Sequence, residues 1–157
     1  MKVRVVEEVA DQIRAWSHEA APLETGGLLL GLYANGEPWV TRVVLVESED
    51  RTRSRYDLPA GITQDAVRRV QSEDPGVGYL GDWHSHPADA GPSPTDLGSL
   101  RWLARQALGR GRRPPIIVVA RLSKDRWLLD ARIGLRWPFT ARTAAVVLTG
   151  PPVLPAH

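Results

Sequence analysis

The sequence contains no cysteine among its 157 residues. This absence excludes disulfide bonds, thiolate nucleophiles, cysteine-ligated zinc and iron–sulfur clusters, so any metal must be bound by histidine, aspartate or glutamate. No apolar run approaches the roughly 20 residues that a membrane-spanning helix needs. Residues 1–16 also lack the uninterrupted apolar stretch of a secretory signal, and we therefore expect a cytoplasmic protein with no membrane partner.

Lysine is scarce as well, because 18 of the 20 basic residues are arginine and only Lys2 and Lys124 are lysine. The formal net charge is +2, and the pI of 9.4 reflects how few groups titrate just above neutrality. The densest arginine groups lie in residues 51–55 and 110–113, and the other arginines are spread along the chain. Nucleic-acid binding requires a clustered basic face, so this distribution favours solvated loops over a nucleic-acid partner.

Hydrophobic periodicity predicts a single α/β (α+β) domain with a mixed sheet and helices on its faces. Strands are expected at residues 2–7, 27–33, 39–46, 77–86, 116–122, 127–135 and 143–148, and helices at residues 8–20, 60–73 and 94–108. Asn35-Gly36 is a strong hairpin signal between the second and third strands, and the polar residues 48–59 are expected to form a loop. We expect residues 1–140 to form the domain, and residues 141–157 to add its C-terminal strand and an irregular tail.

Two histidines occur two residues apart at the carboxyl end of a predicted strand, in the segment Gly81-Asp82-Trp83-His84-Ser85-His86-Pro87. Side chains alternate along a strand, so His84 and His86 project from one face, about 7 Å apart along the backbone. Asp96 lies just inside the next predicted helix and can return a carboxylate to the same place. Two imidazoles and one carboxylate leave a fourth tetrahedral position for water, which is the composition of a catalytic zinc site.

The same residues also admit structural explanations. A His-x-His pair alone is weak evidence for a metal site. Ser93, Pro94 and Asp96 fit the N-cap, N1 and N3 positions of a helix that starts with a capping box. Glu24 precedes Gly26-Gly27, so it is either a solvent-facing residue beside a glycine turn or a carboxylate near the metal that serves as general base and then general acid. The residues alone leave both explanations open.

Taken together, Glu24, His84-Ser85-His86-Pro87 and Ser93-x-x-Asp96 resemble the JAMM motif of MPN/JAB-domain metallopeptidases, prokaryotic type. The resemblance covers residues 3–135 and implies a cytidine-deaminase-like sandwich of a mixed sheet with flanking helices. It implies one zinc ion (Zn2+) per chain bound by His84, His86 and Asp96, with Glu24 as general base and Ser93 as the donor that steadies the oxyanion. The spacing from His86 to Ser93 is shorter than in the common family pattern.

The resemblance also implies a substrate, the peptide or isopeptide bond after the C-terminal Gly-Gly of a ubiquitin-like or sulfur-carrier protein. Activating or conjugating enzymes encoded in the same operon are further expected partners. In this arrangement the hairpin joined at Asn35-Gly36 and the loop 48–59 flank the site, and Arg51, Arg53 and Arg55 either meet acidic groups of the partner or are solvated loop charges. The alternatives are a non-catalytic MPN-type scaffold and a RadC-like DNA-associated protein. The complete set of five residues and the absence of a helix–hairpin–helix region favour the metallopeptidase.

Overall fold

Every predicted helix and strand is present in the computed structural model, which describes residues 1–47, 62–135 and 140–153, and each boundary lies within two residues of its expected place. The elements are β1 (Lys2–Val6), α1 (Glu7–Ala20), β2 (Gly26–Ala34), β3 (Glu37–Leu45), α2 (Ile62–Glu73), β4 (Gly78–His86), α3 (Pro94–Gly109), β5 (Ile116–Ser123), β6 (Arg126–Gly134) and β7 (Ala141–Thr149). None of the described helices is long and apolar enough to cross a membrane.

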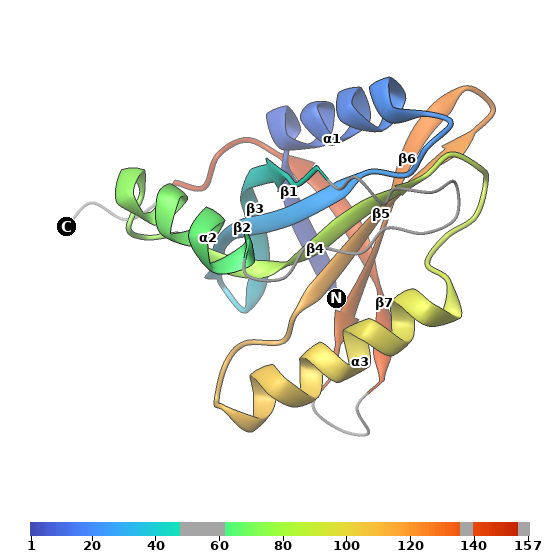
Figure 1. Ribbon diagram of the computed structural model, residues 1–157. Helices are drawn as coiled ribbons and strands as arrows, with labels where there is room; N and C mark the ends of the chain where they lie inside the picture. Colours follow the sequence, from blue (N-terminus) through green and yellow to red (C-terminus); the bar gives the residue numbers. More distant parts are fainter. Residues whose placement is uncertain (48–61, 136–139, 154–157) are drawn as a thin grey trace.

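The strands form a closed barrel in the order β1-β3-β2-β4-β5-β6-β7 (Figure 1). β1 runs parallel to both β3 and β7, β4 runs parallel to β5, and the other pairs are antiparallel. The mixed sheet with flanking helices is therefore confirmed. The finer expectation of a cytidine-deaminase-like sandwich is not confirmed. The pairing of β1 with β7 closes the sheet instead, and closure removes exposed strand edges from the described barrel.

Alternate residues of the strands fill the inside of the barrel, and α1 completes this core. Val9, Ala10 and Ile13 recur at helical spacing on one face of α1 and belong to the same buried cluster as Val3 and Val5 of β1. Each valine or isoleucine side chain removed from water in this way stabilises the fold by roughly 1.5–3 kcal/mol. The helix is also fixed by a stacked aromatic pair, since the ring centroids of Trp16 and Trp83 lie 5.9 Å apart.

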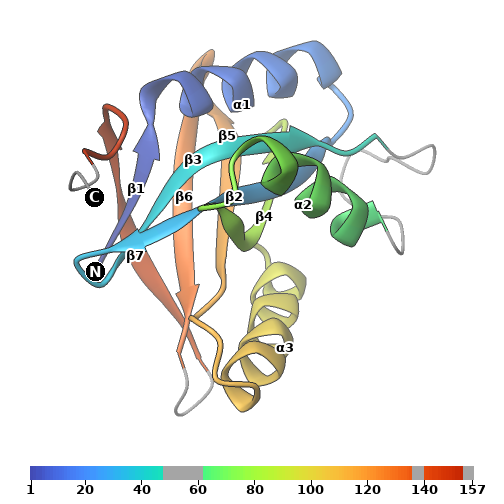
Figure 2. The same cartoon turned by 90° about the vertical axis from the view of Figure 1, so that its left-hand side faces the viewer.

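The other two helices cover the outer face of the barrel (Figure 2). Leu28 and Leu30 of β2 point outward, because side chains alternate along a strand. They pack against α2 through Ala66, Val67 and Val70. Helix α3 covers β5, because its Leu100 packs on Ile117 and Val119 of that strand. The outward side chains of β4 consequently lie between two helix-covered strands.

The turn between β2 and β3 has the backbone that the sequence predicts. Asn35 and Gly36 both have positive φ, 52° and 76°, as a two-residue hairpin turn with matched twist requires. The hairpin that it joins reaches the site with its open end, and the turn itself lies away from the histidines. Gly26, at the opposite end of β2, pairs with His84, so the length of the strand, about 26 Å at 3.3 Å per residue, separates the turn from the histidines. The loop 48–59, with Arg51, Arg53 and Arg55, lies outside the described residues.

Candidate metal centre

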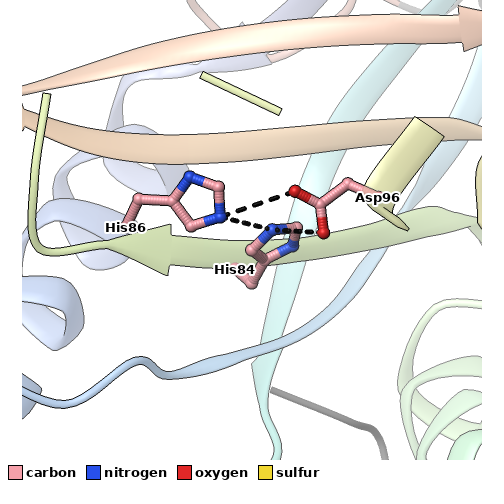
Figure 3. A group of neighbouring side chains, drawn as sticks. All are labelled: His84, His86 and Asp96. Atoms are coloured by element: carbon pink, nitrogen blue, oxygen red, sulfur yellow. Dashed lines mark hydrogen bonds and ion pairs between the residues drawn. The ribbon is translucent and has the colours of Figure 1, made fainter. Parts of the chain in front are cut away.

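Three side chains converge at the carboxyl end of β4 and the start of α3 (Figure 3). The Nε2 atoms of His84 and His86 lie 3.2 Å apart. Asp96 Oδ1 lies 3.2 Å from the first nitrogen, and Oδ2 lies 3.5 Å from the second. Nitrogen and oxygen ligands at about 2.0–2.1 Å from a tetrahedral zinc ion are themselves about 3.3–3.4 Å apart. The three donors therefore have the separation that a shared zinc ion requires.

The orientation of the His86 ring supports a cation at this point. Its Nδ1 lies 2.8 Å from the carbonyl oxygen of Ala90, which can only accept a hydrogen bond, so Nδ1 carries the proton. In the neutral ring Nε2 then presents a lone pair toward His84 Nε2 and the carboxylate of Asp96. Lone pairs that face one another across 3.2–3.5 Å need a proton or a metal ion between them. The donor set fits a metal ion bound by two neutral imidazoles and a carboxylate.

Asp96 is held in place by the start of α3. Ser93 Oγ accepts a hydrogen bond from the Asp96 N–H at 3.1 Å, and the Ser93 N–H donates to Asp96 Oδ2 at 2.7 Å. The predicted capping box is therefore confirmed, and the same carboxylate also faces both histidines. Burial acts to raise the pKa of Asp96, but hydrogen bonds with His84 and His86 outweigh it and hold this pKa well below its usual range. The hydrogen bond with Asp96 in turn raises the pKa of His86.

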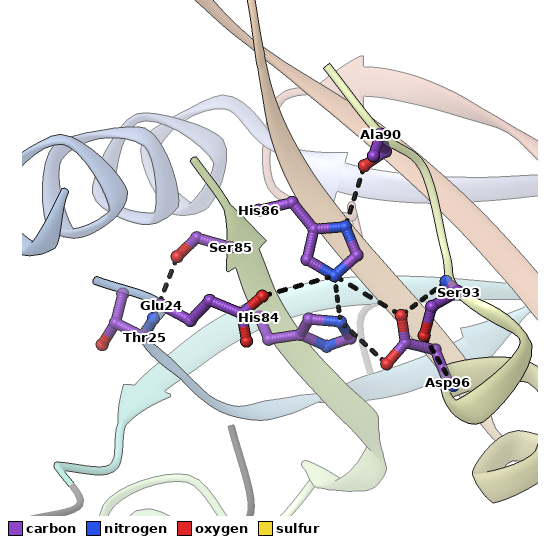
Figure 4. A network of polar contacts seen from close by, with 8 residues as sticks. All are labelled: Glu24, Thr25, His84, Ser85, His86, Ala90, Ser93 and Asp96. Atoms are coloured by element: carbon purple, nitrogen blue, oxygen red, sulfur yellow. Dashed lines mark hydrogen bonds and ion pairs between the residues drawn. The ribbon is translucent and has the colours of Figure 1, made fainter. Parts of the chain in front are cut away.

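Glu24 lies two residues before β2 and points toward the histidines (Figure 4). It is 3% exposed, which contradicts the alternative of a solvent-facing loop residue. Its Oε1 lies 3.9 Å from His86 Nε2, and burial raises its pKa to about 7, against an opposing effect of His86. Gly26 and Gly27 allow β2 to lie close to its neighbouring strands, since a Cβ at Gly26 would lie 2.4 Å from the carbonyl oxygen of Trp83.

Ser85, between the two histidines, has a role that the sequence analysis did not assign. Its side chain is fully buried, and its Oγ accepts a hydrogen bond from the Thr25 N–H at 2.9 Å. The Ser85 N–H donates to the Thr25 carbonyl at 2.8 Å. These bonds join the strand that carries the histidines to the segment that carries Glu24. The available signal was a small polar residue that alternation places on the same face of the strand as the buried Trp83.

A cavity of about 790 Å³ lies at the other end of β4, between β2 and the C-terminal half of α3. Aromatic and basic side chains line it, among them Tyr33, Tyr79, Trp102 and Arg113. None of the five site residues predicted from the sequence borders this cavity. The converging donor atoms, and not the cavity, therefore mark the candidate site.

Comparison of the sequence with known proteins gives three matches. A family model described as prokaryotic homologs of the JAB domain matches residues 6–130. A protein named probable metalloprotease y4qB, from Sinorhizobium fredii, is 34% identical over 135 residues, which cover 83% of this chain and 79% of that protein. A CD-NTase/cGAS isopeptidase from Pseudomonas aeruginosa is 31% identical over 99 residues, which cover 61% of each protein.

Two solution structures resemble the fold over nearly the whole chain. Protein DSY2949 from Desulfitobacterium hafniense has a TM-score of 0.66 at 18% identity and covers 95% of this chain and 94% of its own. A protein from Salinibacter ruber has a TM-score of 0.61 at 26% identity and covers 100% of this chain and 97% of its own. These similarities indicate a shared fold.

Proposed function

Because the chain belongs to the family of prokaryotic JAB-domain proteins, we propose that it is a zinc metallopeptidase with His84, His86 and Asp96 as metal ligands. The observation that carries this proposal is the donor set itself, two imidazole nitrogens 3.2 Å apart that each lie within 3.5 Å of a carboxylate oxygen. Three such ligands leave one coordination position for a reactant. When bound, zinc would act as a Lewis acid and bring the pKa of a water molecule close to neutrality.

We assign Glu24 the role of general base and then general acid. Its carboxylate lies beside His86 and is nearly excluded from solvent. In the metal-free protein burial raises the pKa of Glu24 to about 7, and a carboxylate within reach of the attacking water can take up a proton and release it again. It accepts a proton from the attacking water as the new C–O bond forms at the scissile carbonyl. It then delivers that proton to the amine nitrogen as the C–N bond breaks.

We assign Ser93 the stabilisation of the negative charge that develops on the carbonyl oxygen. Its Oγ accepts the N–H of Asp96, so the hydroxyl hydrogen is available to another acceptor. The side chain is half-buried at the N-terminus of α3, next to the proposed metal ligands. Backbone N–H groups at the start of a helix add partial positive charge to the same place.

The substrate that we propose is a peptide or isopeptide bond after the terminal Gly-Gly of a ubiquitin-like or sulfur-carrier protein. The relative from P. aeruginosa is named an isopeptidase, which supports this bond type. A tail that ends in glycines has no Cβ to collide with a carboxylate and two imidazoles around the reacting carbonyl. Activating and conjugating enzymes of the same cytoplasmic system are the partners that such a substrate implies.

The test uses wild-type protein and the variant Glu24→Gln with a ubiquitin-like protein fused through Gly-Gly to a reporter peptide. The proposal predicts about one zinc ion per chain in both proteins, and cleavage after Gly-Gly by the wild type alone. Absence of zinc from both the purified and the zinc-reconstituted wild type would overturn the enzymatic proposal. Zinc binding without cleavage of any ubiquitin-like or sulfur-carrier fusion would instead favour a non-catalytic scaffold.

A further inference from the structure

Residues 87–92 follow β4 and lead toward α3. Side chains that the proposed chemistry does not use attach these residues to β5 and β6. Arg121 Nε donates to Asp130 Oδ2 at 2.7 Å, and the same guanidinium donates through NH1 to Asp89 Oδ1. Ser123 Oγ donates to the other oxygen of Asp89 at 2.9 Å. One arginine thus holds two carboxylates, one on the barrel and one on the segment beside the metal ligands.

This set of contacts, which we call the Arg121 clamp (Arg121, Ser123, Asp130 and Asp89), lies next to the metal centre because of strand register. Arg121 is the partner of His86 in the parallel pairing of β4 and β5. Paired residues of neighbouring strands project from the same face of a sheet, so both side chains stand on the outer face of the barrel. The segment that leaves β4 after His86 therefore passes directly over Arg121.

One peptide group connects the Arg121 clamp to the hydrogen bond of a proposed metal ligand. Asp89 is followed by Ala90, whose carbonyl oxygen lies 2.8 Å from His86 Nδ1 (Figure 4). That carbonyl is the acceptor that keeps the proton on Nδ1 and leaves Nε2 free to bind a metal ion. Asp89 itself is 59% exposed, and exposed ion pairs contribute little to stability. These contacts still fix the position of the Ala90 carbonyl, although they contribute little to the free energy of folding.

We propose that Arg121 is a positioning residue for the metal centre: through Asp89 it holds the Ala90 carbonyl against His86 Nδ1, and so sets the tautomer and orientation of this ligand. The inference rests on the proposed metal site. Without the clamp, residues 87–92 lose their attachment to β5, and His86 loses the acceptor that selects its tautomer. Partners of this kind typically change metal affinity by about 10–100-fold.

The experiment titrates the metal-stripped full-length chain with Zn2+ against a chromophoric chelator, and with Co2+ while the visible absorption spectrum is recorded. The variants are Arg121→Ala, Asp89→Ala and the double variant. We expect each single variant to bind Zn2+ about tenfold more weakly and to shift the Co2+ absorption bands, which report ligand geometry. The double variant should lose no more than either single variant, because both residues act through one carbonyl.

Arg4→Ala is the matched control. Arg4 Nε contacts Glu37 Oε2 at 2.5 Å with both side chains 28% exposed, in an ion pair at the turn end of the barrel. This variant should lower the melting temperature and leave Zn2+ affinity and the Co2+ spectrum unchanged. Should Arg121→Ala fail to fold, Ser123→Ala removes one contact of Asp89 and should weaken Zn2+ binding in the same direction.

An Arg121→Ala protein with Zn2+ affinity within twofold of the wild type and an unchanged Co2+ spectrum would overturn the positioning role. If Arg121→Ala does not fold, the same result for Ser123→Ala would do so. Failure of the proposed metal site itself gives a different result, since the wild type would then bind neither Zn2+ nor Co2+.

Discussion

Replacement of Glu24 by glutamine tests the electrostatics of the site without any substrate. The two side chains have almost the same shape, so the substitution removes a charge from a group that is 3% exposed and changes the packing little. In the metal-free protein burial raises the pKa of Glu24 from 4.5 to about 7. The folded chain thus binds this proton more tightly than the unfolded chain.

The sign and size of the effect follow from that difference in pKa. The stability that depends on the protonated form is fully present below pH 4.5 and is lost as the pH rises through about 7. The difference between a pKa of 4.5 and one of about 7 corresponds to about 3 kcal/mol, at about 1.36 kcal/mol for each pH unit. Metal-free Glu24→Gln should therefore gain up to about 3 kcal/mol of unfolding free energy, relative to the wild type, between pH 4.5 and pH 8.

The assay is urea unfolding of both metal-free proteins at several pH values in this range, with the free energy of unfolding extrapolated to zero urea. Glu47→Gln is the control, because Glu47 is exposed and its variant should follow the wild type throughout. A Glu24→Gln curve that stays parallel to the wild-type curve from pH 4.5 to pH 8 would refute the reasoning that burial makes this carboxylate costly to ionise.

Three further predictions concern the residues around the metal and the substrate. Ser93→Ala should keep zinc and lose about 10²–10³-fold in turnover, as expected for one oxyanion donor, together with about 1 kcal/mol of helix-cap stability. An unchanged turnover number per folded molecule would leave Ser93 only the capping role. Ser85→Ala should lower the free energy of unfolding by about 1–3 kcal/mol, because the buried Thr25 N–H loses its acceptor, and a denaturation midpoint equal to the wild type would contradict this. Replacing the penultimate glycine of the substrate by a bulky residue should abolish cleavage in a gel assay, and equal cleavage would contradict a narrow substrate groove.

The elements of the fold could be predicted because their signals are local. Leu28, Leu29 and Leu30 form a run with no visible alternation, yet its length and the following Asn35-Gly36 indicate a strand covered on both faces. Closure of the barrel has no such signal. It depends on the pairing of β1 with β7, between the two ends of the chain, and the hydrophobic pattern of each strand is the same in an open and a closed sheet.

That Glu24, His84, His86, Ser93 and Asp96 come together in the fold could be predicted, because residue type, spacing and order carried the information; their roles stay predictions. Their surroundings could not, because contacts such as Arg121 with Asp89 depend on which strands pair and in which register. The position of the Asn35-Gly36 turn likewise depends on strand pairing, because Gly26, at the opposite end of β2, is the residue that pairs with His84.

The cleavage rate of metal-stripped wild-type protein on a ubiquitin-like Gly-Gly fusion, measured as Zn2+ is added in steps, shows whether the protein is a zinc peptidase. We expect a rate that starts near zero, rises in proportion to bound zinc and stops rising at one equivalent per chain. A rate that does not depend on zinc, or a chain that binds zinc through other residues when His84 and Asp96 are both replaced by alanine, would contradict the proposal.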